Sequence, residues 1–223
     1  MSAIKDNVQK ILQELPSGVE LVVAAKTRTP EEVLEAVAGG ATIIGQNYVQ
    51  EAERAQAACG RDRIRWHMIG HLQRNKAKKA VEIFDMVETL DSIELGRELD
   101  KRAGAAGQTI DALIEINSGR EPQKTGVMPE AAEALARELA GLSNVRVRGL
   151  MTMGPFEGDP EDSRPYFKET VRVFEHIKSL AIPSIEMKHL SMGMTNSWRV
   201  AVEEGATMVR IGTAIFGTRV YLT

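Results

Sequence analysis

The feature that most constrains the fold of this chain is a repeated alternation of short apolar segments with longer amphipathic ones. Eight apolar segments have the length of strands, and a segment with helical periodicity follows each of them. Strands that alternate with helices predict a parallel sheet covered on both faces. The expected strands span residues 21–25, 41–44, 65–69, 83–88, 111–116, 145–152, 184–190 and 208–211. The expected helices span residues 30–38, 49–58, 75–80, 92–105, 129–140, 160–180, 196–204 and 214–220, after an amphipathic N-terminal helix.

The number and size of these units favour a closed barrel. Eight units in 223 residues give about 28 residues per unit, close to the roughly 30 of a (β/α)8 barrel. A doubly wound open sheet is the alternative, but the chain lacks the GxGxxG fingerprint of dinucleotide-binding folds. No linker-like stretch divides the chain. We therefore expect one α/β domain over residues 1–223, a single (β/α)8 TIM-like barrel whose functional residues gather at the C-terminal ends of the strands.

Lys26 stands at the end of the first expected strand. It follows the apolar run 21–25, and Thr29 and Pro30 then give the signals of a helix start. Burying an ammonium group there is costly and favours the neutral amine, which can form a Schiff base with an aldehyde. The alternative is an ordinary lysine that reaches solvent and pairs with a carboxylate, and Lys26 alone does not decide between the two.

The loops after the last two expected strands have the composition of an anion site. Gly193 and Gly212 would let backbone N–H groups approach an anion, and Ser191 and Thr213 add hydroxyl donors. In (β/α)8 barrels these two loops often bind phosphate. The alternative is that the two glycines serve only turns.

Arg210 lies inside an apolar strand and needs a partner when buried. One interpretation is a structural ion pair with Glu115 or Glu186. The other pairs the guanidinium with a ring nitrogen of a cofactor. Arginine stays protonated and only donates, so a pyridine nitrogen facing it would stay unprotonated and the ring would be a weak electron sink.

Three further residues are candidates for lining the site. Asn47 follows the second expected strand, although it could equally cap the next helix. His71 follows the third strand, and Met192 belongs to a methionine-rich set that we expect to fill the core and the pocket walls. Four histidines and one cysteine show no metal-ligand spacing, so we expect no metal site.

Composition limits the partners. The net charge of −3 argues against nucleic acid or an anionic membrane as the main partner. No apolar stretch is long enough to span a bilayer, and the N-terminus does not have the pattern of a signal peptide. The single cysteine, Cys59, fits a reducing compartment. We expect a cytoplasmic protein.

Six motifs, in order along nearly the whole chain, resemble the pyridoxal-phosphate homeostasis protein family. That family consists of single-domain relatives of the N-terminal barrel of alanine racemase, so the resemblance implies the same barrel. The motifs are VVAAKT at 22–27, GQNYVQE at 45–51, WHMIGHLQRNK at 66–76, GLMTM at 149–153, LSMGM at 190–194 and VRIGTAIFG at 209–217.

The resemblance also implies a cofactor and roles for individual residues. Lys26 would carry pyridoxal 5'-phosphate as a Schiff base, Arg210 would face the pyridine nitrogen, and Asn47 would line the ring. The phosphate would be held by Ser191, Gly212 and Thr213. Two departures from the family pattern, Gln46 for Glu and residues 118–120 for Gly-Gly-Glu, leave the roles of those positions open.

The implied function is storage or delivery of the cofactor, with effects on vitamin B6 and amino-acid balance and with apo-enzymes as partners of a monomer. We expect no catalytic residues, because no second base is evident opposite Lys26. A weak amino-acid racemase or another pyridoxal-phosphate enzyme is the first alternative. A cofactor-free Schiff-base aldolase is a more distant one, since it leaves Arg210 without a task.

Overall fold

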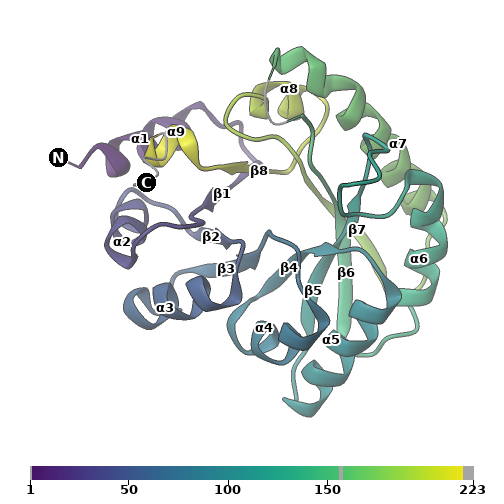
Figure 1. Cartoon of the computed structure of the whole chain (residues 1–223). Helices are drawn as coiled ribbons and strands as arrows, with labels where there is room; N and C mark the ends of the chain where they lie inside the picture. Colours follow the sequence, from purple (N-terminus) through teal and green to yellow (C-terminus); the bar gives the residue numbers. More distant parts are fainter. Residues whose placement is uncertain (1, 156–157, 218–223) are drawn as a thin grey trace.

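The computed structural model describes residues 2–155 and 158–217, which form a closed barrel of eight parallel strands surrounded by helices (Figure 1). Each strand pairs with its neighbours in sequence, and pairing of the first strand with the last closes the barrel. This confirms the predicted (β/α)8 barrel and rules out the open sheet. The strands are β1 Glu20–Ala24, β2 Ile43–Gln46, β3 Arg65–Met68, β4 Met86–Leu90, β5 Ile110–Ile116, β6 Val145–Thr152, β7 Ile185–Ser191 and β8 Met208–Ile211.

Helices cover the outside of the barrel, one or more between consecutive strands. The α-helices are α1 Ala3–Glu14, α2 Pro30–Ala38, α3 Val49–Cys59, α4 Ala77–Ile83, α5 Ile93–Ala105, α6 Ala132–Leu139, α7 Arg164–Ser179, α8 Trp198–Glu203 and α9 Thr213–Phe216. Three short 3₁₀ helices precede α4, α6 and α7, namely η1 Arg74–Lys76, η2 Pro129–Ala131 and η3 Pro160–Ser163. In the described part of the chain, no helix combines the length and the apolar character that crossing a bilayer requires.

Most expected boundaries lie close to the observed ones, and the junction of α4 and β4 differs more. The helix was expected to end at residue 80 and the strand to begin at residue 83, but α4 continues to Ile83 and β4 begins at Met86, because the apolar residues of segment 81–87 are divided between a helix end and a strand start. The last helix was expected over residues 214–220, whereas α9 spans Thr213–Phe216. Residues 218–220 of that expectation lie outside the described residues.

The two faces of the strands build two apolar layers. Alternate residues of β1 show this: Val22 joins a small cluster in the barrel interior, while Val23 packs in the large layer between strands and helices. The first and last helices of the described chain are in contact, since the Asn7 side chain of α1 donates to the Ile215 carbonyl of α9 at 2.9 Å. This places the start of the chain beside the helix that follows β8.

Candidate functional site

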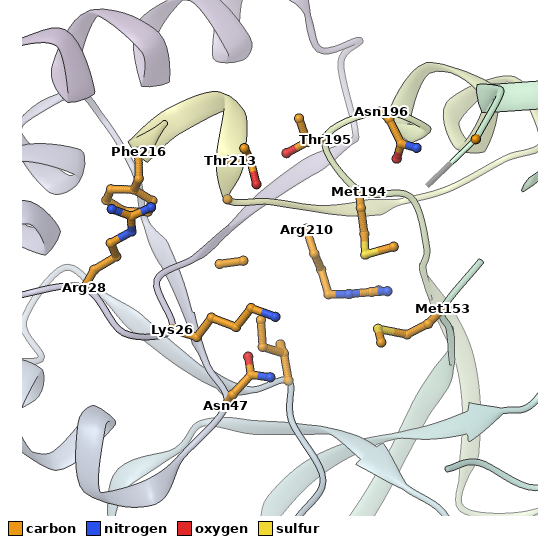
Figure 2. Close-up of a pocket in the computed structure, with 14 residues that line it drawn as sticks. Lys26, Arg28, Asn47, Met153, Met194, Thr195, Asn196, Arg210, Thr213 and Phe216 are labelled. Carbon is orange, nitrogen blue, oxygen red and sulfur yellow. The ribbon is translucent and has the colours of Figure 1, made fainter. Parts of the chain in front are cut away.

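A cavity of about 480 Å³ opens at the C-terminal ends of the strands (Figure 2). Its volume lies in the range of ordinary small-molecule sites. The loops after β1, β2, β6, β7 and β8 contribute to it, as (β/α)8 barrels predict for a functional face. Five of the eight residues expected at the site line this cavity: Lys26, Asn47, Arg210, Gly212 and Thr213.

Lys26 enters the cavity from the turn that follows β1. Figure 2 shows its side chain extended into the space between Asn47 and Arg210. The next residue, Thr27, has a φ of 64°, a left-handed conformation that costs a β-branched residue about 1–3 kcal/mol. The Glu51 carboxylate of α3 accepts a hydrogen bond from the Thr27 N–H at 3.0 Å. A neighbouring helix therefore supports the strained turn that presents the lysine.

The beginning of α2 holds the other side of this turn. Thr29 accepts a hydrogen bond from the Glu32 N–H, and Glu32 accepts one from the Thr29 N–H, so the predicted helix start is a complete capping box. Arg28 pairs with Glu32 at 3.2 Å and lies 5.0 Å over the Phe216 ring. Arg28 and Phe216 both line the cavity, and their contact joins the β1 loop to α9.

Asn47 reaches the cavity from the end of β2. Its alternative role as a helix cap is wrong, because Tyr48 occupies the N-cap position of α3 and its side chain makes no capping bond. Gly70 packs directly against this residue, since a Cβ atom there would lie 2.6 Å from the Asn47 carbonyl oxygen. The close approach requires a glycine and fixes the end of β2 against the loop after β3.

Arg210 projects from β8 into the floor of the cavity and is 4% exposed. Its Nη1 donates to the Ser191 hydroxyl at 2.6 Å, and its Nη2 donates to the Thr152 carbonyl at 2.8 Å. The Glu88 carboxylate lies 4.0 Å from Nη1. Burial lowers the pKa of Arg210, and Glu88 opposes that effect. The guanidinium is thus held by three strands other than its own.

The partners proposed for a structural ion pair of Arg210 differ from the observed one. Glu186 pairs instead with Arg148, because it lies near the start of β7, at the opposite end of the barrel. Glu115 accepts a hydrogen bond from the Thr125 hydroxyl at 2.8 Å. The ion-pair partner of Arg210 is Glu88 of β4, which sequence reasoning did not single out.

Three of the expected site residues lie away from the cavity lining. Ser191 is fully buried in the barrel interior, where its hydroxyl donates to Glu88 Oε2 at 2.5 Å. Met192 is fully buried on the opposite side of the strand end, in the layer between strands and helices. The His71 side chain is 51% exposed, and its Nδ1 lies 3.6 Å from Asp91.

Sequence reasoning missed a hydroxyl on the cavity wall. Thr195 lines the cavity, and its Oγ1 accepts a hydrogen bond from the Ala214 N–H at 3.3 Å. This contact joins the loop after β7 to α9, and Thr195 lies above Arg210 in Figure 2. The signal was present in the sequence, because Thr195 follows Gly193 within the glycine-containing loop.

Comparisons with known proteins identify the family. The profile described as alanine racemase, N-terminal domain, matches residues 1–220. The pyridoxal phosphate homeostasis protein of Aquifex aeolicus is 38% identical over 227 residues, which cover 99% of this chain and 97% of that protein. The chain belongs to the pyridoxal phosphate homeostasis protein family. The resemblance drawn from the six motifs is therefore confirmed.

Solved structures agree with membership of the pyridoxal phosphate homeostasis protein family. PipY of Synechococcus elongatus PCC7942, solved with pyridoxal phosphate bound, is 32% identical, with a TM-score of 0.88 and coverage of 96% of this chain and 100% of that one. An alanine racemase of Clostridium difficile has a TM-score of 0.82 at 16% identity, with coverage of 99% of this chain and 57% of that one. The second likeness concerns the fold alone.

Proposed function

We propose that this chain binds pyridoxal 5'-phosphate in the cavity at the C-terminal ends of the strands, attached through a Schiff base to Lys26, and serves cofactor homeostasis. The observation that carries the proposal is the meeting of the Lys26 amine with the Arg210 guanidinium in one cavity, from opposite ends of the chain. We further propose that the domain comprises residues 1–223, acts as a monomer and delivers the cofactor to apo-enzymes.

The residues present fit the chemical groups of this cofactor. An aldehyde requires an amine, which Lys26 provides. A pyridine nitrogen accepts a hydrogen bond, and the two described side-chain contacts of Arg210 use only two of its five N–H donors. We assign the phosphate to Gly212, Thr213 and Thr195. Ser191 is a weaker candidate for the phosphate than its sequence position suggested, because its hydroxyl already serves Glu88 and Arg210.

The same residues favour holding the cofactor over catalytic turnover. When bound, pyridoxal phosphate supplies an aldehyde and an electron-withdrawing ring, and a guanidinium partner leaves the ring nitrogen unprotonated and the ring a weaker electron sink. Racemisation also needs a second base opposite Lys26. Tyr48 and Tyr166 lie outside the cavity lining, and Tyr221 falls outside the described residues.

Titration of the purified protein with pyridoxal phosphate, followed by visible absorbance, tests this proposal. We expect saturable binding in the wild type and loss of the bound chromophore in Lys26→Ala. Lys101→Ala, an exposed lysine on α5, is the matched control and should bind like the wild type. The proposal fails if the wild type develops no chromophore, or if Lys26→Ala develops the same one.

Delivery and turnover need separate measurements. An apo-enzyme that requires pyridoxal phosphate should regain activity when it is mixed with the loaded wild-type protein. This reactivation should be faster than the reactivation seen with Lys26→Ala protein that has been treated with pyridoxal phosphate in the same way. Exchange of the Cα proton of free amino acids in deuterated water distinguishes the racemase alternative. Turnover at ordinary enzyme rates of about 1 s⁻¹ or more would overturn the homeostasis role.

A further inference from the structure

A buried polar network lies in the barrel interior beneath the cavity. Glu88 of β4 is fully buried, and its two oxygens have separate partners. Oε1 lies 2.6 Å from His67 Nδ1 on β3, and Oε2 accepts the Ser191 hydroxyl of β7 at 2.5 Å. The same hydroxyl accepts a hydrogen bond from Arg210 Nη1 at 2.6 Å. A continuous series of contacts therefore runs from His67 through Glu88 and Ser191 to Arg210.

Two buried carboxyl groups could balance the charge of Arg210, and they differ in their protonation. Burial opposes ionisation of Glu88, but the hydrogen bond from His67 and the charges of His67 and Arg210 outweigh it and hold the pKa of Glu88 below its ordinary value. Burial raises the pKa of Glu115, and its Oε2 has no hydrogen-bond partner in the described structure. Both carboxyl groups act on Arg210, but only the surroundings of Glu88 favour its ionised form, and Glu88 is the one that forms an ion pair with Arg210, at 4.0 Å from Nη1.

We infer that Glu88 is the counter-ion that positions Arg210 toward the cofactor cavity, acting through the hydroxyl of Ser191. Glu88 is absent from the cavity lining, so it is a positioning residue rather than a catalytic one. This inference rests on the proposed function, because it concerns the residue assigned to the pyridine nitrogen.

The physical argument concerns a buried cation. A guanidinium that is 4% exposed is stable only when paired and hydrogen-bonded. The Thr152 carbonyl and the Ser191 hydroxyl supply hydrogen bonds but no charge. Without the Glu88 charge, Arg210 gains by turning toward water in the cavity and giving up these two bonds. The side chain would then no longer face the ring in a fixed orientation.

The first experiment measures the pyridoxal phosphate Kd by absorbance for Glu88→Gln and, as the matched control, Glu115→Gln, each with Arg210 present and in an Arg210→Gln background. Glutamine keeps the shape of the side chain, removes its charge and replaces one accepting oxygen with an NH2 donor, and the Arg210→Gln background separates the loss of charge from the changed hydrogen bond. We expect Glu88→Gln to raise the Kd about tenfold when Arg210 is present and less than about twofold in Arg210→Gln. Glu115→Gln should change it less than about twofold in both. Equal effects of Glu88→Gln in the two backgrounds would overturn the inference.

The second readout is the pH midpoint of the absorbance change of the bound chromophore. This midpoint would not change if Glu88 served only the stability of the fold. Loss of one negative charge near the site disfavours proton binding there, so the pH midpoint of the absorbance change should fall by about half a unit or more in Glu88→Gln. Glu115→Gln should leave the midpoint in place. A midpoint that stays unchanged in both variants contradicts the role of Glu88.

A third readout uses the protein without cofactor. Arg210→Gln leaves Glu88 its contacts with His67 and Ser191 but removes the guanidinium charge that balances it, so it should lower the Tm, and adding Glu88→Gln should restore part of the loss. A double variant that melts below both single variants would show that Glu88 serves the core alone. These outcomes are separate from failure of the proposed function, which would appear as wild-type protein that binds no pyridoxal phosphate.

Discussion

The two mouths of the barrel hold cavities of similar size, about 480 Å³ at the C-terminal ends of the strands and about 560 Å³ at the N-terminal ends. In the cavity at the N-terminal ends, called the lower cavity below, charged side chains form ion pairs with each other: Arg65 pairs with Glu20, and Arg148 pairs with Asp111. In the cavity at the C-terminal ends, called the upper cavity below, the Lys26 amine and the Arg210 guanidinium lie in one lining with the hydroxyl groups of two threonines. Glu88, which pairs with the guanidinium, lies beneath that lining. Volume alone therefore does not distinguish the two mouths of the barrel, whereas the arrangement of their charges does.

The largest expected effect comes from placing a negative charge in each cavity. Thr213→Asp should raise the Kd for pyridoxal phosphate about a hundredfold, or roughly 2.7 kcal/mol, because the carboxylate repels the phosphate. Lys188→Glu, which adds negative charge to the lower cavity, should leave the Kd within about twofold. Titration by absorbance measures both. An equal loss of affinity for pyridoxal phosphate in the two variants would contradict the distinction between the cavities.

The strained turn at Thr27 gives the next largest effect. Glu51→Ala removes the carboxylate that holds the Thr27 N–H and should weaken cofactor binding about tenfold. Thr27→Gly should restore most of that loss, because glycine adopts a φ of 64° without strain. The measurement is the Kd for pyridoxal phosphate of Glu51→Ala, of Thr27→Gly and of the double variant. If Thr27→Gly restores nothing, the conformation of the turn does not govern the position of Lys26.

The two buried acids predict opposite dependences of stability on pH. The folded-state pKa of Glu88 lies below its ordinary value of 4.5, so it contributes stability that is present above pH 4.5 and is lost as the pH falls through its folded pKa. The folded-state pKa of Glu115 is raised, so its contribution is lost as the pH rises from 4.5 through that pKa. Denaturant unfolding of Glu88→Gln and Glu115→Gln against the wild type, across acidic pH, should show these two signs. The same sign in both variants would contradict the assignment.

The smallest effect belongs to the lower cavity. Arg148→Ala breaks pairs at the barrel's N-terminal mouth and should reduce the free energy of unfolding by about 1 kcal/mol or less. The Kd for pyridoxal phosphate should stay the same. A clear loss of binding would mean that the lower mouth communicates with the upper one.

The parts of this structure that depend on local patterns were predictable from the sequence. The barrel followed from the count of strand–helix units, β8 was predicted at both ends, and Lys26 and Arg210 were found because each is a charged residue at or inside an apolar strand. The cost of burying a charge marks such a residue in the sequence, whatever its distant contacts are.

The parts that depend on long-range packing were not predictable. Glu88 meets Ser191 and Arg210 only because the barrel closes, and these residues are more than 100 positions from Glu88 in the chain. The inward orientation of Ser191 also depends on register shifts in the strand pairs before it, between β4 and β7, and a shift of one residue exchanges the two faces. Pattern alone therefore placed Ser191 at the cavity and left Glu88 unnoticed.

The most direct test of the central claim is to reduce the protein with borohydride after addition of pyridoxal phosphate and to locate the added mass by peptide mass spectrometry. The account predicts one dominant modified peptide, labelled at Lys26, at substoichiometric cofactor. Label spread over surface lysines, or concentrated on a lysine outside the upper cavity, would contradict it.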